Sequence, residues 1–354
     1  MNRVLCTVIQ IDWEGPDVND RAVELLEQYE IEVLRTRKGR GAIICDTDRG
    51  LMIFKEYTGN SDRIALQNRL LEEIAARNVI QAERIIPSKD GALLVQDGDS
   101  TSYVLKTWVD GRECNIYDRG ECSQTVRLLA KLHQCMELPA DTPGLPVPFS
   151  PEKEYEKHNR ELKRVRKFLK QKGQKTWFEI SLLNAFDYFL EQALAVTEEW
   201  KEYSMALEAE DHRSSGGSIT FCHGDYQYHN ILKSGNGWFL VNFEKCLADN
   251  PVRDLNLLLR KMLEKGNWSM SLGTELLSAY EAEVPLTVAS RIDLYYRLAY
   301  PEKFWKIANF YYNSGKAWIP GRNQEKLEKL IAQEKEKQHF LDEVFRSVEY
   351  LRRT

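Results

Sequence analysis

One polar segment, residues 222–232, carries an acid and an amide at a spacing that suits phosphoryl transfer. Cys222-His223-Gly224-Asp225 leads into Asn230, five residues after the acid, and the chain then returns to the strand-like pair Ile231-Leu232. Transfer of a phosphoryl group to a hydroxyl needs a carboxylate that accepts the hydroxyl proton and a neutral oxygen ligand for a nearby Mg²⁺. We therefore predict that Asp225 is the catalytic base and that Asn230 is a metal ligand.

A second polar group follows at the end of the next apolar strand. Residues 238–241 are apolar and lead into Asn242-Phe243-Glu244. Asn242 and Glu244 are two residues apart on extended chain, so their side chains point to one face, and the family resemblance given in the next paragraph implies that this face binds the metal. An asparagine lacks the full negative charge that Mg²⁺ prefers beside phosphate oxygens. We expect Mg²⁺ binding to be weakened unless Glu244 substitutes as a ligand.

These residues resemble a known catalytic core. His223-Gly224-Asp225 with Asn230, followed by Asn242-Phe243-Glu244, is similar to the H-G-D-x-x-x-x-N and I-D-F/W-E motifs of the aminoglycoside phosphotransferase and choline kinase superfamily. The chain departs from that pattern at Asn242, where the family has an aspartate. Residues 250–255, 300–306 and 311–313 are similar to spore-coat-associated kinase-like proteins (the CotS family), and this similarity extends over most of the chain from about Val23 onward.

The resemblance implies further site residues and the cofactors ATP and Mg²⁺. Lys55 ends an apolar strand at the position of the lysine that holds the α- and β-phosphates of ATP as a point charge. In the family this lysine pairs with a glutamate of the following helix, for which Glu72 and Glu73 are both candidates. Val109 lies in the predicted hinge and is a candidate nucleotide contact. His223 is expected to hold the catalytic loop by hydrogen bonds.

The composition limits the class of protein. A chain of 354 residues suggests about two domains, and a formal net charge of −5 gives no argument for nucleic acid as a partner. The seven cysteines are scattered without C-x-x-C spacing, which favours reduced thiols over disulfides or a zinc site. The N-terminal apolar stretch is short and is interrupted by Asp12 and Glu14, so it predicts no signal peptide or membrane anchor. We expect a cytoplasmic protein, and the resemblance adds incorporation into the spore coat.

The order of predicted elements indicates an α+β, bilobal, protein-kinase-like fold. A small antiparallel sheet is expected from strands over 31–37, 42–46, 51–57, 91–96 and 103–108, with helices over 17–29 and 61–77, the second capped by Ser61. The predicted N-lobe covers residues 1–107, and a helical C-lobe with the catalytic loop covers 108–354. The C-lobe is expected to contain a charged helix over 155–174, a helix pair over 177–208 and a last helix over 323–348. The helical insert near 151–212 would set specificity.

Two side-chain groups outside this core have both functional and structural interpretations. The aromatic residues between Tyr295 and Tyr312 form either a cation-binding box of the choline-kinase kind or part of the core. The basic residues of the 155–174 helix either receive an anionic partner or form a solvated face. The favoured interpretation is the structural one in each case.

Two functions remain open from the sequence. The first is ATP-dependent phosphorylation of a hydroxyl on a small molecule or glycan-like acceptor, in association with the spore coat. The second is a catalytically impaired kinase-like protein, a pseudokinase, that binds nucleotide or spore-coat proteins as an assembly factor. The sequence identifies neither the acceptor nor the oligomeric state.

Overall fold

The computed structural model describes residues 23–39, 41–211, 217–314 and 321–346. These residues form two compact units, and each is described by itself. The first unit takes its described residues from Met1–Cys114, Lys131–Leu145 and His223–Cys246, and the second from Asn115–Ala130, Pro146–Cys222 and Leu247–Thr354. The segment with Asp225 and Asn230 therefore packs with the N-terminal sheet, although a lobe boundary at residue 107 would assign it to the helical part.

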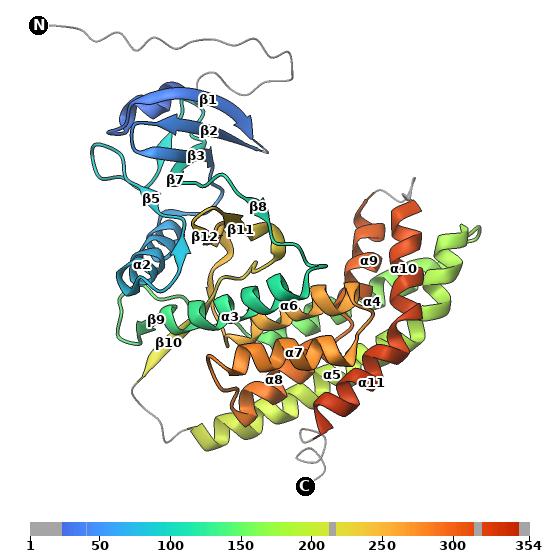
Figure 1. Ribbon diagram of the computed structural model, residues 1–354. Helices are drawn as coiled ribbons and strands as arrows, with labels where there is room; N and C mark the ends of the chain where they lie inside the picture. The colour runs from blue at the N-terminus through green and yellow to red at the C-terminus, as the bar shows by residue number, and fades with distance from the viewer. Residues whose placement is uncertain (1–22, 40, 212–216, 315–320, 347–354) are drawn as a thin grey trace, which may run out of the picture. The chain divides into compact units, whose positions relative to one another are not determined.

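An antiparallel sheet forms the N-terminal part of the first unit (Figure 1). Its strand order is β1 (Val33–Gly39), β2 (Ala42–Thr47), β3 (Gly50–Glu56), β7 (Ser102–Thr107) and β5 (Ile85–Ile86), and β6 (Val95–Gln96) also pairs with β7. One face buries a core of Leu26, Tyr29, Ile43, Cys45, Met52, Phe54, Val95 and Leu105. The predicted strands over 31–37, 42–46 and 51–57 are confirmed to within two or three residues at each end. Arg40, which separates β1 from Gly41 in the sequence, lies outside the described residues.

The register of this sheet places two lysines on its other face. Ile53 of β3 lies opposite Lys106 of β7, and Lys55 lies opposite Val104. Side chains alternate between faces along a strand, while directly opposed residues share a face. Lys55 and Lys106 therefore point to the same side of the sheet, away from the apolar core.

Helix α2 (Ser61–Arg77) follows β3 and matches the predicted span. The N-cap is Asn60 rather than Ser61, because the Asn60 side chain accepts a hydrogen bond from the Arg63 amide at 2.9 Å. The buried face consists of Ile64, Gln67, Leu70, Leu71 and Ile74. The predicted helix over 17–29 begins outside the described residues, and within them the chain forms the short 3-10 helix η1 (Leu25–Gln28).

A second sheet of the first unit carries the catalytic segment. Its strand order is β4 (Gln81–Ala82), β12 (Gly237–Leu240), β11 (Ile231–Ser234) and β8 (Arg112–Glu113). The 3-10 helix η2 (Tyr228–Asn230) enters β11, and η3 (Phe243–Lys245) follows β12. Because Ile231 pairs with Leu240, the residues just before β11 and just after β12 lie side by side. The hairpin therefore brings together two polar groups that are 12 residues apart in the chain.

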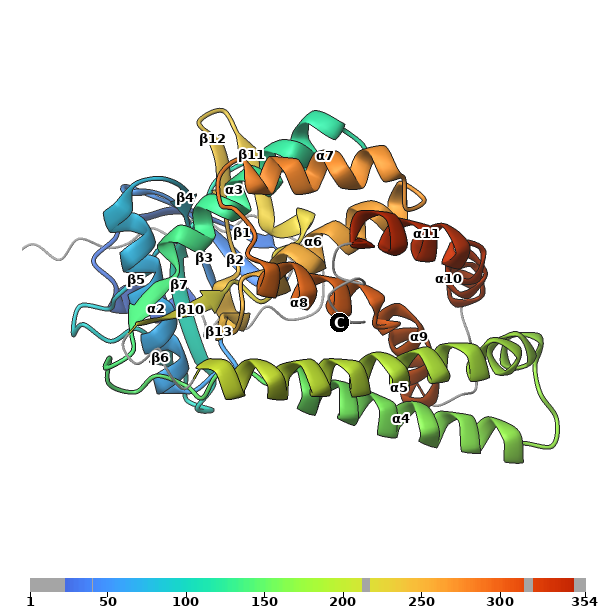
Figure 2. The ribbon, with the colours of Figure 1, turned by 90° about the horizontal axis from the view of Figure 1, so that it is seen from below.

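The second unit is mainly helical. Its long helices α4 (Pro151–Gln171) and α5 (Trp177–Asp211) run beside each other (Figure 2). The predicted pair of helices over 177–208 is wrong, since this glycine- and proline-free stretch forms one continuous helix. The remaining elements of this unit are the paired strands β10 (Ser218–Cys222) and β13 (Leu247–Ala248) and the helices α6 (Val252–Lys265), α7 (Met270–Glu281), α8 (Val288–Ala299), α9 (Glu302–Asn313), α10 (Gly321–Ala332) and α11 (Glu334–Val344). Helix α3 (Arg119–Cys135) is shared between the two units, and β9 (Glu137–Pro139) belongs to the first.

Three details of the helical unit differ from or settle the sequence predictions. Helix α4 starts before the predicted residue 155, because Ser150 caps it and Pro151 occupies its first turn. The predicted last helix is divided at Gln333, whose side-chain amide donates to the Glu264 carbonyl at 3.0 Å. Four of the aromatic residues between Tyr295 and Tyr312 belong to the core, namely Tyr296, Tyr300, Phe304 and Tyr311, and Tyr300 stacks on Tyr155 with ring centroids 4.2 Å apart, whereas Phe310 is exposed. Among the described helices, none has the length and apolar character that crossing a bilayer requires.

Candidate functional site

His223 holds the loop that presents Asp225. The His223 ring is buried, its Nε2 donates to the Val241 carbonyl at 3.0 Å, and its Nδ1 accepts from the Asp225 amide at 3.2 Å. Gly224, between the two residues, has a φ of 77°, a conformation that glycine adopts without strain. Both ring nitrogens of His223 thus form hydrogen bonds that position the loop, as expected from the sequence.

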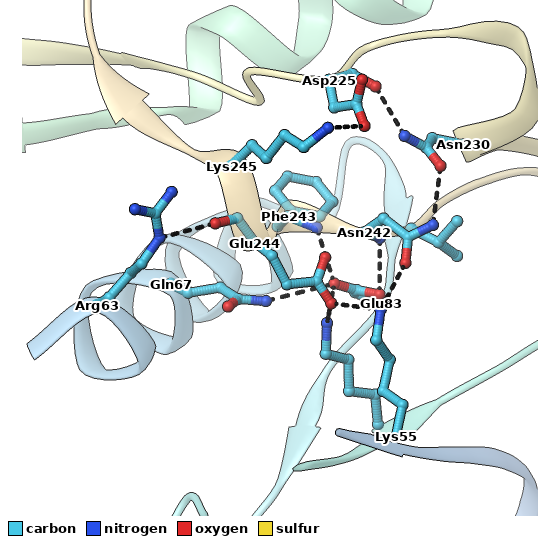
Figure 3. A network of polar contacts seen from close by, with 12 residues as sticks. Lys55, Arg63, Gln67, Glu83, Asp225, Asn230, Asn242, Phe243, Glu244 and Lys245 are labelled. Carbon is cyan, nitrogen blue, oxygen red and sulfur yellow. Dashed lines mark hydrogen bonds and ion pairs between the residues drawn. The ribbon is translucent and has the colours of Figure 1, made fainter. Parts of the chain in front are cut away.

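The Asp225 carboxylate is ionised and partly exposed. Its Oδ2 lies 2.9 Å from the Lys245 ammonium, and its Oδ1 accepts a hydrogen bond from the Gln227 amide. Burial favours the neutral acid, but the hydrogen bonds from Lys245 and Gln227 outweigh it and hold the pKa of Asp225 below its ordinary value. Figure 3 shows Lys245 on one side of Asp225 and Asn230 on the other.

Two asparagines meet where the β11–β12 hairpin opens. The side-chain amide of Asn242 donates to Asn230 Oδ1 at 2.8 Å. The side-chain amide of Asn230 donates to the backbone carbonyl of Asp225, also at 2.8 Å. Asn242 Oδ1 in turn accepts from the Lys55 ammonium at 3.3 Å. Both side-chain oxygens that the sequence analysis assigned to a metal therefore have protein donors.

Glu83 fixes the turn after β12. Asn242 has φ 66° and ψ 56°, in the left-handed region that asparagine tolerates better than most residues. The Glu83 carboxylate accepts from the backbone amides of Asn242 and Phe243 at 2.9 and 3.0 Å, and it also receives the Gln67 amide of α2 at 3.5 Å. With the turn held in this way, the Asn242 side chain faces Asn230 of the catalytic loop and the Glu244 carboxylate faces the lysines of the N-terminal sheet (Figure 3).

Lys106 is the buried cation of this network. Its ammonium lies 2.9 Å from Glu83 Oε1 and 2.5 Å from Glu244 Oε1, and neither Lys106 nor Glu83 is exposed by more than 1%. Lys55 contacts the same Glu244 oxygen at 2.9 Å. Burial favours neutral Glu244, but Lys106 and Lys55 overcome this and lower its pKa to about 2. Burial likewise disfavours a charged Lys106, yet the two carboxylates raise its pKa above the ordinary value.

Lys106 and Glu83 were missed by the sequence analysis. The sequence contains a signal for Lys106, because this lysine interrupts the apolar strand predicted over 103–108. A charged residue inside a buried strand usually has a partner of opposite charge. Glu83 had none, since it follows a strand of only two residues and its partners lie far away in sequence.

A cavity of about 560 Å³ brings the main candidates together. This volume is in the range of small-ligand sites. Lys55 and Asp225 both line it, and so do Asn230, Asn242 and Glu244. The other lining residues are Glu56, Tyr57, Thr58, Gly59, Arg63, His229 and Lys245, and all belong to the first unit.

Two predicted site residues lie elsewhere. Glu72 is exposed and accepts a hydrogen bond from Asn68 on its own helix, so its predicted pairing with Lys55 is wrong; Glu244 is the carboxylate that pairs with Lys55. Val109 packs, half-buried, against the apolar cluster of Leu232, Phe239 and Val241. A nucleotide contact by Val109 stays a prediction.

Comparison with known proteins places the chain in a family. The family model described as "Spore coat putative kinase YutH" matches residues 22–344. The chain belongs to this family. Spore coat protein S of Bacillus subtilis (strain 168) is 25% identical over 341 residues, which cover 91% of this chain and 93% of that protein. The resemblance to spore-coat kinase-like proteins is therefore confirmed.

Solved structures show the same fold. An aminoglycoside phosphotransferase from Alicyclobacillus acidocaldarius subsp. acidocaldarius DSM 446 matches with a TM-score of 0.79 at 19% identity, over 96% of this chain and 98% of that one. The amicoumacin kinase hAmiN, in complex with AMP-PNP, Ca²⁺ and Ami, matches with a TM-score of 0.57 at 12% identity, over 90% of this chain and 92% of that one. The α+β fold class, with an antiparallel sheet followed by a helical part, is confirmed.

The magnesium ion that this fold implies does not fit the residues present. Mg²⁺ is held in such sites by one or two carboxylates together with substrate phosphates. Position 242 offers an amide, and Glu244 Oε1 already contacts two ammonium groups. Among the residues that the structure describes, no group of three or more His, Cys, Asp and Glu side chains is arranged to hold a metal ion.

The buried cation generates a stability prediction. Lys106→Met should lower the free energy of unfolding by about 3–5 kcal/mol, because it leaves the buried Glu83 carboxylate without its counter-charge. Urea denaturation measures the change. The double variant Lys106→Met/Glu83→Gln should recover part of the loss, since no buried charge is then unpaired. A single variant as stable as the wild type would contradict the role of Lys106.

The low pKa of Glu244 predicts a pH dependence. A folded-state pKa of about 2, below the ordinary 4.5, means that ionised Glu244 stabilises the native state above pH 4.5 and that this contribution is lost as the pH falls toward 2. Glu244→Gln should therefore destabilise the protein at about pH 6 and much less at about pH 3. Urea denaturation of both proteins at both pH values gives the difference. An equal penalty at both would contradict the ion pairs, and Glu325→Gln, at an exposed position of α10, is the control.

Proposed function

We propose that this chain binds a nucleoside triphosphate in the cavity and serves the spore coat as a nucleotide-binding assembly factor with impaired phosphoryl transfer. One observation carries the proposal. Lys55 and Asp225 line one cavity, as a kinase requires, yet Glu244 is neutralised by Lys55 and Lys106 and position 242 lacks its carboxylate. The site therefore keeps the cationic phosphate-binding lysine while its metal-binding acids are absent or occupied.

The family and its relatives support this assignment. The chain belongs to the spore-coat kinase family, and its relative in Bacillus subtilis bears the name of a coat protein. The hAmiN structure contains AMP-PNP and Ca²⁺ in the same fold. Loss of metal assistance alone accounts for slow transfer, because a barrier higher by about 3 kcal/mol slows a step by roughly a hundredfold.

Nucleotide binding is tested by thermal unfolding. ATP at about 100 times its dissociation constant should stabilise the native state by about 2.7 kcal/mol and raise Tm. Lys55→Met should abolish the shift, measured against its own Tm without ligand, because the cavity loses its innermost exposed cation. Lys163→Met, on the exposed face of α4, is the matched control and should keep the shift. No shift in the wild type with ATP, ADP or GTP at millimolar concentration would refute the proposal.

A second function, phosphorylation of a hydroxyl on a small molecule or glycan-like acceptor, is favoured by Asp225. Its carboxylate is ionised and faces the cavity, where it could orient and deprotonate a hydroxyl. In this case the wild type should turn over ATP, with or without a panel of hydroxyl acceptors, and Asp225→Asn should abolish the turnover. Turnover that does not exceed that of Asp225→Asn supports the assembly factor instead.

A further inference from the structure

The cavity supplies its positive charge from its own side chains. Three of its lining residues are cations, Lys55, Arg63 and Lys245, and three are carboxylates, Glu56, Asp225 and Glu244. Asn242 adds no charge, whereas an aspartate there would leave one negative charge in excess. The lining is thus balanced without a divalent ion, and the Lys106–Glu83 pair behind it is balanced as well.

Lys245 is the cation that can change partner. Its side chain is 65% exposed, compared with 24% for Lys55, and its ammonium contacts the Asp225 carboxylate at 2.9 Å. Moving an exposed ammonium costs little desolvation, and exposed ion pairs of this kind contribute little to stability. The Gln227 amide would still donate to Asp225 after Lys245 had moved. Lys245 is therefore free to exchange the carboxylate for a phosphate oxygen.

Lys106 reduces the competition of the Glu244 carboxylate with that phosphate for Lys55, and Arg63 fixes the backbone of the same glutamate. Arg63 Nε donates to the backbone carbonyl of Glu244 at 2.9 Å, and this hydrogen bond connects helix α2 to the turn after β12 (Figure 3). Lys106 holds the Glu244 carboxylate from the buried side. The Lys55 ammonium has three donors, of which two face Asn242 and Glu244, so one remains available for a ligand.

We propose that this cavity binds the phosphate chain of a nucleoside triphosphate without a divalent cation, with the Lys245 and Lys55 ammonium groups occupying the role of the metal. The inference rests on the proposed nucleotide binding. The carboxylates that would hold a divalent ion are replaced or already paired, while two lysines, Lys55 and Lys245, line the cavity. Ammonium groups bind phosphate as compact point charges and need no precise coordination geometry.

Calorimetric titration of ATP into the full-length protein, once in EDTA and once in MgCl₂, tests this inference. The wild-type Kd should agree within about threefold between the two conditions. Lys245→Gln should weaken binding in EDTA by about tenfold or more, which corresponds to about 1.4 kcal/mol. Lys163→Gln removes the same charge from the exposed face of α4 and should bind as the wild type does. Inorganic tripolyphosphate should compete with ATP in EDTA, since the contacts are to phosphate.

A reciprocal variant gives the opposite expectation. Asn242→Asp adds the excess negative charge and a free carboxylate, so ATP should bind it at least about tenfold more tightly in MgCl₂ than in EDTA. Circular dichroism of each variant shows that it is folded.

The outcomes separate the two proposals. Binding of wild type only in MgCl₂, or wild-type affinity of Lys245→Gln in EDTA, would overturn the metal-free site while leaving nucleotide binding intact. Absence of binding in both buffers would overturn the proposed function, and the metal-free site with it.

Discussion

The ammonium of Lys106, buried between Glu83 and Glu244, is the interaction on which the site depends. A buried charge is tolerated only when opposite charges and hydrogen bonds satisfy it, and here the loop after β4 and the turn after β12 each contribute a carboxylate to the ammonium on β7. Glu83 extends the network by binding the backbone amides of Asn242 and Phe243. The strand pairing, the turn and the cavity lining are thus coupled through one cation.

This arrangement explains how the chain accommodates Asn242 where the phosphotransferase motif that it resembles has an aspartate. The amide can donate to Asn230 while its oxygen accepts from Lys55, which an ionised carboxylate could do only in part. The left-handed backbone at this position suits asparagine. Because Lys106 and Lys55 both neutralise Glu244, the site is internally satisfied, and we regard it as adapted to hold phosphate with side-chain cations.

Local patterns in the sequence were enough to predict the residues that lie next to each other along one hairpin or one strand. Asp225, Asn230, Asn242 and Lys55 were found because motif spacing and strand ends are short-range signals. The Lys106–Glu83 pair and the Lys55–Glu244 pair join residues from distant segments, so only the folded chain reveals them. Glu72 failed as a partner because the inward face of α2 runs through Gln67 and Leu71, and the adjacent position 72 points to solvent.

The most direct test of the account is a crystal structure of the protein with a non-hydrolysable ATP analogue, grown in the presence of Mn²⁺, with anomalous scattering used to locate the metal. The account predicts that the Lys245 ammonium lies within hydrogen-bond distance of a phosphate oxygen and that no anomalous peak occurs between Asn230 and Asn242. A manganese ion bound by Asn230 and Asn242, with Lys245 still on Asp225, would contradict it.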